Sequence, residues 1–140
     1  LYLYPPMFGL IDNNPFGLKV DSFLRLADID FTVETLLDTS NAPRNQLPYV
    51  DDNGTILGDS NAIIEHFIRT RRINMDADLT ENQRQLHFLS VRMLDMHLYW
   101  VMSYSRWQDE RYYAQFRDAL IIFRSDLIVF EYFYLILFPC

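Results

Sequence analysis

Apolar residues return every three or four positions after Asn14, which is the pattern of one face of an amphipathic helix. These residues are Phe16, Val20, Phe23, Leu24 and Ala27. Asn14 is followed directly by Pro15, and this pair is typical of a helix start, with asparagine as the N-cap and proline in the first turn. The pattern therefore predicts a helix from Pro15 to about Asp28.

Short runs rich in β-branched and aromatic residues predict strands on both sides of this helix. The runs are Leu1–Tyr4, Phe31–Leu37, Tyr49–Val50 and Thr55–Leu57. Asn53 and Gly54 between the last two runs are a strong hairpin signal, and Asp59 and Ser60 open a further helix. A strand–helix–strand unit implies a parallel pair, and the hairpin adds two antiparallel strands. Residues 1–70 are therefore predicted to form one α/β domain.

The pattern changes in the second half of the chain. Residues 71–80 are mostly polar and charged, and we interpret them as a linker. Thr80 and Gln83 have the spacing of a capping box, and a long helix with a broad apolar stripe follows them. The later elements are a second helix and an apolar core segment, over Gln108–Phe123 and Ile121–Phe138. Residues 81–140 are thus predicted to form a helical domain.

Composition narrows the class of protein. The chain has 140 residues, of which 50% are hydrophobic and 22% charged, so it can bury a core and is not expected to be disordered. Its net charge of −7 argues against a nucleic-acid binder, which would need a basic surface. The single cysteine, Cys140, cannot form a disulfide within the chain, and no Cys/His spacing fits a zinc site.

Neither a targeting segment nor a membrane span is apparent. Leu1–Tyr4 lacks the basic residues that begin a signal peptide. The longest uncharged part of the last apolar run, Tyr132–Cys140, is far shorter than the roughly 20 residues that span a bilayer. We therefore expect a cytoplasmic protein in a reducing compartment. Because the chain lacks an initiator methionine, we also expect it to begin inside a longer gene product.

The most specific pattern lies in residues 47–65. It consists of Leu-Pro, a strand, a turn with acidic residues and Gly, a second strand, then Asp-Ser and a helix. This order closely resembles that of the cytosolic glutathione transferase family. The resemblance implies an α/β thioredoxin-like N-terminal domain followed by an all-α glutathione-transferase-type C-terminal domain. The helical part is shorter than is usual in that family, so we expect either a shortened domain or a chain from which residues are missing.

The resemblance also implies a glutathione-binding site. In this fold the Leu47–Pro48 bond would be cis, and the N–H and C=O of Leu47 would pair with an extended peptide such as glutathione. The structural alternative is that Pro48 merely begins an edge strand. At the next helix start, where an anion is favoured, Ser60 would bind the γ-glutamyl carboxylate and Asp59 the α-ammonium. Plain N-capping is the alternative for both residues.

The catalytic residue is harder to identify from this resemblance. Family enzymes lower the pKa of the glutathione thiol near the start of the first helix with a Tyr, Ser or Cys, but residues 12–20 contain no Ser or Cys. Asn14 stands where Cys-Pro-Phe members have the cysteine, and Asn13 where Ser-x-Pro members have the serine. In the asparagine-using Nu-type branch the asparagine follows the proline, a position held here by Phe16. Tyr4 ends the first strand, near the hydroxyl of Tyr-type members.

The candidate catalytic residues are therefore Asn14, Asn13 and Tyr4, with the Phe16 and Gly17 amides as further donors. An asparagine amide can donate a hydrogen bond to a thiolate but cannot take its proton, so cysteine-type thiol transfer is not expected. Each candidate has a structural alternative. The alternative for Asn14 is a helix N-cap, and the alternative for Tyr4 is a core or interface aromatic.

Two functions from different classes fit these residues. The first is a homodimeric glutathione transferase that binds glutathione, as substrate and without a further cofactor or metal, and conjugates or reduces a hydrophobic electrophile. The second is a non-catalytic binding or interaction module, because Pro-Phe-x-Leu-Lys followed by Leu24 and Arg25 also resembles the metaxin and failed-axon-connections branch, which includes many adaptors. The missing Ser and Cys favour the second function, and the intact Leu-Pro and Asp-Ser elements favour the first.

Overall fold

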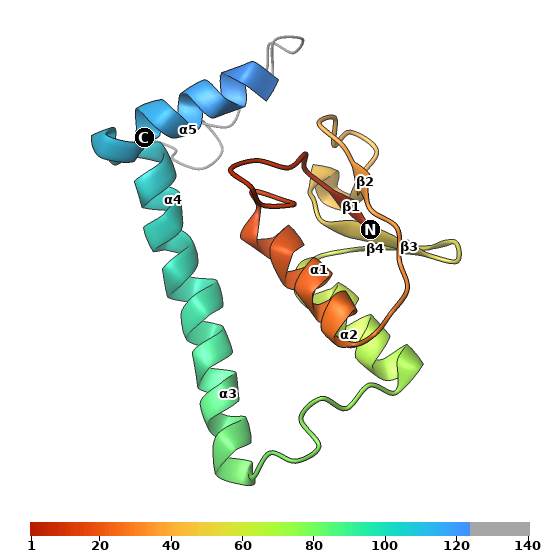
Figure 1. Cartoon of the computed structure of the whole chain (residues 1–140). Helices are drawn as coiled ribbons and strands as arrows, with labels where there is room; N and C mark the ends of the chain where they lie inside the picture. The colour runs from red at the N-terminus through yellow and green to blue at the C-terminus, as the bar shows by residue number, and fades with distance from the viewer. Residues whose placement is uncertain (124–140) are drawn as a thin grey trace. The chain divides into compact units, whose positions relative to one another are not determined.

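The computed structural model describes residues 1–123, which divide into two compact units (Figure 1). The first unit is Leu1–Phe88, and the second begins at Leu89. The first unit contains, in order, β1 (Tyr2–Leu3), α1 (Pro15–Leu26), β2 (Glu34–Thr35), the short 3₁₀ helix η1 (Pro43–Asn45), β3 (Tyr49–Asp52), β4 (Thr55–Gly58) and α2 (Ser60–Arg71). This is the predicted order of strands and helices.

The four strands form one mixed sheet in the order β2-β1-β3-β4. β1 is parallel to β2 and antiparallel to β3, and β3 pairs antiparallel with β4 through the predicted hairpin. Together with α1 and α2 this is a thioredoxin-like arrangement, which confirms the predicted fold class.

β1 and β2 are much shorter than predicted, with two residues each. Pro5 and Pro6 follow β1, and proline has no N–H to donate to a ladder, so β1 cannot continue. β2 lies at the edge of the sheet and pairs with β1 alone, so its length is limited by β1. The predicted strand Phe31–Leu37 therefore contributes only Glu34 and Thr35.

The core of the first unit lies between the sheet and the two helices. The buried side chains come from β1 and the residue before it, α1, β3 and α2, and they are Leu1, Leu3, Val20, Leu24, Val50, Ile63 and Phe67. The α1 and α2 pairs are spaced four residues apart, as one face of a helix requires. The apolar pattern after Asn14 thus identified the buried side of α1, which ends two residues earlier than predicted, at Leu26.

A second set of helices follows residue 80. They are α3 (Glu81–Met93), the π-helical turn η2 (Leu94–Leu98), α4 (Tyr99–Trp107) and α5 (Glu110–Phe123). The predicted capping box is present, because the Thr80 N–H donates to Gln83 Oε1 at 2.8 Å. The π-helical turn inside the long predicted helix had no sequence signal. The boundary between the two compact units falls inside α3, and the proposed domain limits at 70 and 81 stay a prediction.

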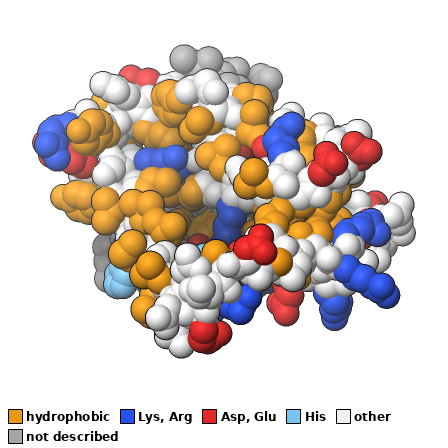
Figure 2. Space-filling view, turned by 60° about the horizontal axis from the view of Figure 1, so that its bottom comes forward, with side chains coloured by type: hydrophobic (Ala, Val, Ile, Leu, Met, Phe, Trp, Pro, Cys, Tyr) orange, Lys and Arg blue, Asp and Glu red, His pale blue; other side chains and the backbone are white. Residues whose placement is uncertain are grey.

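The apolar stripe of α3, η2 and α4 is exposed. At least half of the accessible surface is retained by Leu86, Leu89, Met93, Met96 and Trp100. Hydrophobic side chains also form broad areas on the face shown in Figure 2. The predicted core segment Ile121–Phe138 lies almost wholly outside the described residues. None of the helices described over residues 1–123 has the length and apolar character needed to cross a bilayer.

Candidate functional site

The β3–β4 hairpin brings two of the predicted motifs to one end of the sheet. Tyr49, the residue after Pro48, pairs with Gly58, the residue before Asp59. The Leu-Pro and Asp-Ser motifs therefore start from the same paired position, although they are separated in the sequence. The register of the hairpin, rather than either motif alone, makes them neighbours.

The start of α1 is tied to the same end. Asn14 Nδ2 donates a hydrogen bond of 2.9 Å to the carbonyl oxygen of Leu47. Tyr4 lies there as well, because β1 runs antiparallel to β3 with Tyr2 opposite Tyr49. Tyr4 is partly buried against the small cluster that contains Leu47 and Tyr49. The chain segments that carry the three predicted catalytic candidates therefore lie at the same end of the sheet as the predicted glutathione motifs.

The Leu47–Pro48 peptide bond is cis, as predicted. Leu47 is buried, with 6% of its surface exposed, and its carbonyl oxygen is held by Asn14. Residues 1–123 place no hydrogen-bond acceptor on the Leu47 N–H. The N–H of Leu47 is therefore a donor that a ligand could use, and the carbonyl oxygen of the same residue already accepts one hydrogen bond.

Asn14 is the N-cap of α1, with its Oδ1 accepting the Phe16 N–H at 3.1 Å. The Phe16 amide, predicted as a further donor to a thiolate, thus already has an acceptor. The side-chain Nδ2 of Asn13 lies 3.5 Å from Met7 Sδ. Asn14 therefore caps the helix, which was the structural alternative for this residue. Its second hydrogen bond, to Leu47, joins two distant segments and is not needed for capping.

Asp12 was missed by the sequence analysis. It is fully buried, and its Oδ1 accepts the Asn14 N–H at 2.8 Å. A Cβ at Gly17 would overlap the Asp12 carboxylate, so the close approach of this carboxylate to α1 requires a glycine. An Asp two residues before a helix-capping Asn is the signal that could have found this turn.

At the start of α2 the cap is Asp59 rather than Ser60. Asp59 Oδ1 accepts the N–H groups of Asn61 and Ala62 at 2.9 and 3.1 Å, and Oδ2 lies 3.4 Å from the Arg44 guanidinium. Burial by itself would raise the pKa of the Asp59 carboxyl, but these donors outweigh it and hold the pKa below its usual range. The carboxylate is therefore ionised at neutral pH.

The backbone around Asp59 is unusual. Asp59 has a φ of +73°, a region that non-glycine residues rarely occupy. Ser60, the first residue of α2, is buried, with 5% of its surface exposed. Backbone strain of the kind seen at Asp59 clusters at active sites and ligand-binding sites.

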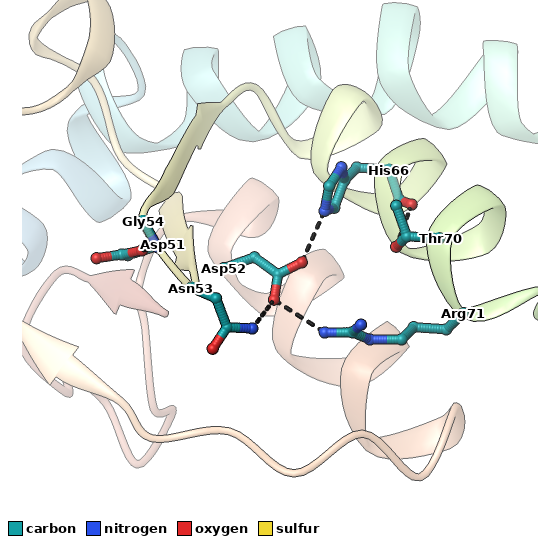
Figure 3. A network of polar contacts seen from close by, with 7 residues as sticks. All are labelled: Asp51, Asp52, Asn53, Gly54, His66, Thr70 and Arg71. Atoms are coloured by element: carbon teal, nitrogen blue, oxygen red, sulfur yellow. Dashed lines mark hydrogen bonds and ion pairs between the residues drawn. The ribbon is translucent and has the colours of Figure 1, made fainter.

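A second polar network lies at the other end of β3 and was also missed (Figure 3). Asp52 Oδ2 is 2.8 Å from His66 Nε2, and Asp52 Oδ1 accepts from Arg71 at 2.9 Å and from Asn53 at 3.1 Å. The His66 hydrogen bond, helped by the charge of Arg71, outweighs burial and lowers the pKa of the Asp52 carboxyl. The network ties the hairpin to α2, so we assign it to folding.

A polar hollow of about 280 Å³ lies near the hairpin turn and the start of the chain. Its lining consists of Leu1, Tyr2, Thr32, Glu34, Asp51, Asn53 and Gly54. None of the predicted site residues lines it, so it is not part of the candidate site. Across the described residues, no group of three or more His, Cys, Asp or Glu side chains is placed to hold a metal ion.

The structure and its site define a class of protein: a thioredoxin-like α/β unit followed by helices. The family model for the glutathione S-transferase N-terminal domain matches residues 15–112. This chain belongs to the glutathione S-transferase family. The match covers most of the first unit and extends through α4 into α5.

Two curated relatives are similar to this chain. Isoprene-epoxide–glutathione S-transferase of Rhodococcus sp. (strain AD45) is 37% identical over 116 residues, which are 79% of this chain and 48% of the relative. Failed axon connections of Drosophila melanogaster is 30% identical over 93 residues, which are 66% of this chain and 22% of the relative. The chain thus spans about half the length of the first relative and less of the second. No solved structure matches it.

Proposed function

We propose that this chain binds glutathione at the end of the sheet where β3 begins and β4 ends, and presents its thiolate to a hydrophobic electrophile. The observation that carries this proposal is the Tyr49–Gly58 pairing, which sets the Leu47–Pro48 peptide beside the Asp59–Ser60 helix start. A peptide with a free amino-acid end, such as glutathione, needs a partner for its extended backbone and a partner for its terminal carboxylate. The Leu47–Pro48 peptide would bind the extended backbone, and the helix start at Asp59 and Ser60 would bind the anion.

The start of α2 would hold the γ-glutamyl end of glutathione. Ser60 would donate to the carboxylate, and the ionised Asp59 would attract the α-ammonium. The Asp59 carboxylate would supply the negative charge that this contact needs. The partial positive charge at the α2 N-terminus favours the carboxylate further.

The thiolate would lie near the start of α1, with the helix dipole as its general stabilising field. Asn13, Asn14 and Tyr4 are the side chains proposed to act there. For the electrophile we propose an epoxide, the class named in the Rhodococcus relative. The sulfur would attack an epoxide carbon, a C–S bond would form as the C–O bond breaks, and the resulting alkoxide would take a proton from water.

Titration calorimetry with glutathione tests the binding step. Wild-type protein should bind saturably, and Ser60→Ala should weaken binding by about tenfold, the effect of roughly 1.4 kcal/mol expected for a lost hydrogen bond to a charged group. Ser22→Ala removes an exposed serine of α1 and is the matched control, with unchanged affinity expected. A wild-type protein that does not bind millimolar glutathione refutes the proposal.

Asp59→Asn separates binding from capping. Asparagine is as good an N-cap as aspartate, so α2 should keep its stability within a few tenths of a kcal/mol. The affinity for glutathione should nevertheless fall, because the α-ammonium loses its counter-charge. Equal affinities of Asp59→Asn and wild type would assign Asp59 to capping alone.

A non-catalytic module is the second candidate, favoured by a specific observation. Both ends of the Asn14 amide and the Phe16 N–H are already engaged in hydrogen bonds, so these groups have little left to offer a thiolate. The similarity to Failed axon connections points the same way. The ultraviolet absorbance of the thiolate separates the two functions: a transferase lowers the thiol pKa of bound glutathione, whereas a module leaves it unchanged.

We further propose a homodimer in the cytoplasm as the working form. Light scattering on the purified protein tests the assembly, and imaging of the tagged protein in cells tests the compartment. A monomer at micromolar concentration would contradict the dimer without bearing on glutathione binding.

A further inference from the structure

The two carboxylate oxygens of Asp59 face different partners. Oδ1 caps α2 by accepting the N–H groups of Asn61 and Ala62 at 2.9 and 3.1 Å, whereas Oδ2 lies 3.4 Å from Nη2 of Arg44. The side chains of Asp59 and Arg44 are 47% and 64% exposed, so a ligand can reach both. The oxygen that the cap leaves to the α-ammonium of a ligand therefore already has a cation beside it.

The backbone of η1 holds Arg44 at this place. Arg44 and Asn45 both have positive φ, at +56° and +55°, which is uncommon for residues other than glycine. The preceding Pro43 packs against β4 so closely that a Cβ at Gly58 would lie 2.9 Å from the Pro43 Cβ. Because Gly58 directly precedes Asp59, this close approach sets Arg44 beside the Asp59 carboxylate.

A second cation lies at the same helix start. Lys19 Nζ, on α1, donates to Asn61 Oδ1 in the first turn of α2 at 2.6 Å. Lys19 and Arg44 thus place two positive charges around the Asp59 carboxylate, and the N-terminus of α2 adds a partial positive charge. A ligand carboxylate meets a net positive charge from these groups, whereas a ligand ammonium has to share Asp59 with Arg44.

Resting on the proposed function, we propose that Arg44 is a specificity-determining residue, because it competes with the α-ammonium of the ligand for Asp59 Oδ2. The ammonium has to displace the guanidinium, so it adds less to the affinity than an uncontested ion pair with Asp59 would. The ligand carboxylate has no such competitor. The site therefore also takes ligands that end in a carboxylate and lack the α-amine, and Arg44 limits how far it distinguishes them from glutathione.

A pair of ligands tests this competition. They are glutathione and glutaryl-cysteinylglycine, which is the same peptide without the α-amino group. The readout is the ratio of their dissociation constants by calorimetry, with the analogue divided by glutathione. Arg44→Gln removes the competing cation, so this ratio should rise about threefold above that of the wild type, the effect expected for an exposed ion pair.

Two further variants are the controls. Arg72→Gln makes the same change at another exposed arginine with positive φ, at the opposite end of α2, and should keep the ratio of the wild type. Arg44→Lys keeps a positive charge beside Asp59 and should keep that ratio as well. A rise in Arg44→Lys as large as that in Arg44→Gln would overturn the proposal, because the charge would not be the cause.

A double variant assigns the effect to the pair. Asp59→Asn keeps the cap of α2 and removes the carboxylate for which the two cations compete. On this background Arg44→Gln should leave the ratio unchanged, because the two substitutions act on one interaction. A threefold rise on the Asp59→Asn background would overturn the competition for Asp59.

The outcomes separate this proposal from the proposed function. Glutathione binding with a ratio in Arg44→Gln that equals or falls below that of the wild type overturns the competition and leaves the proposed function standing. An arginine that only binds a carboxylate shared by both ligands gives this result, since its loss weakens both affinities equally. Wild-type protein that binds neither ligand overturns both proposals.

Discussion

Asp52 is a polar residue whose loss should destabilise the first unit. Asp52→Ala removes its contacts with His66 at 2.8 Å, Arg71 at 2.9 Å and Asn53 at 3.1 Å. The side chains of Asp52 and His66 are only 13% and 14% exposed, so the bond between them should be worth about 1.5–3 kcal/mol. Arg71 is 46% exposed, and its pair adds at most about 1 kcal/mol. We therefore expect the free energy of unfolding to fall by about 2–3 kcal/mol.

The effect should depend on pH. The pKa of Asp52 is lowered by folding, so its ionised form stabilises the protein above the unfolded pKa of about 3.9. This stabilisation is lost as the pH falls through the lower, folded pKa. The stability difference between the wild type and Asp52→Asn, which cannot ionise, should thus be full at neutral pH and narrow below about pH 4.

Urea unfolding followed by circular dichroism measures both effects. Tryptophan fluorescence is unsuitable, because Trp100 and Trp107 both lie beyond Leu89, in the second unit. Asp30→Ala, which removes an exposed carboxylate, is the control and should change stability by less than about 0.5 kcal/mol. A cost for Asp52→Ala below about 0.5 kcal/mol, or an Asp52→Asn difference that is the same at acid and neutral pH, would refute the reasoning.

Three further changes should alter stability. Ile63→Ala empties a fully buried position between α2 and the sheet and should cost about 2–5 kcal/mol in urea unfolding, against about 1 kcal/mol or less for the exposed Ile68→Ala. Gly17→Ala should destabilise by about 1–3 kcal/mol, because the new Cβ overlaps the Asp12 carboxylate; an unchanged melting temperature would show that the carboxylate can move. Thr80→Ala removes the capping box of α3 and should cost about 1 kcal/mol, seen as faster amide hydrogen exchange in the first turn of α3, with α5 as the internal reference.

Much of the candidate site could be predicted because its signals are local. The Asn14-Pro15 pair specifies a helix start through a hydrogen bond between residues two positions apart. Asn53-Gly54 specifies the hairpin because the turn needs residues that tolerate positive φ, and both have it. Leu47–Pro48 and Asp59 were found through the family pattern around them, and each lies next to the hairpin strand that positions it.

The missed residues depend on partners far away in the sequence. Asp12 is a polar loop residue in the sequence, and its burial follows from the packing of Gly17 against it. Asp52 and His66 are 14 positions apart, and either alone is an ordinary surface residue type. The length of β2 likewise followed from its pairing with the short β1, which no propensity within β2 contains.

For this protein the sequence by itself determined the order of elements, the helix caps and the hairpin, because each rests on contacts within a few residues of the chain. It also determined the family, through a motif of consecutive positions. Only the tertiary structure decided which distant groups meet at the candidate site. The bond from Asn14 to Leu47 crosses 33 positions, and it exists because β3 returns to the start of α1. That return places the carbonyl of Leu47 within reach of the Asn14 amide, and neither residue indicates this contact in its own stretch of sequence.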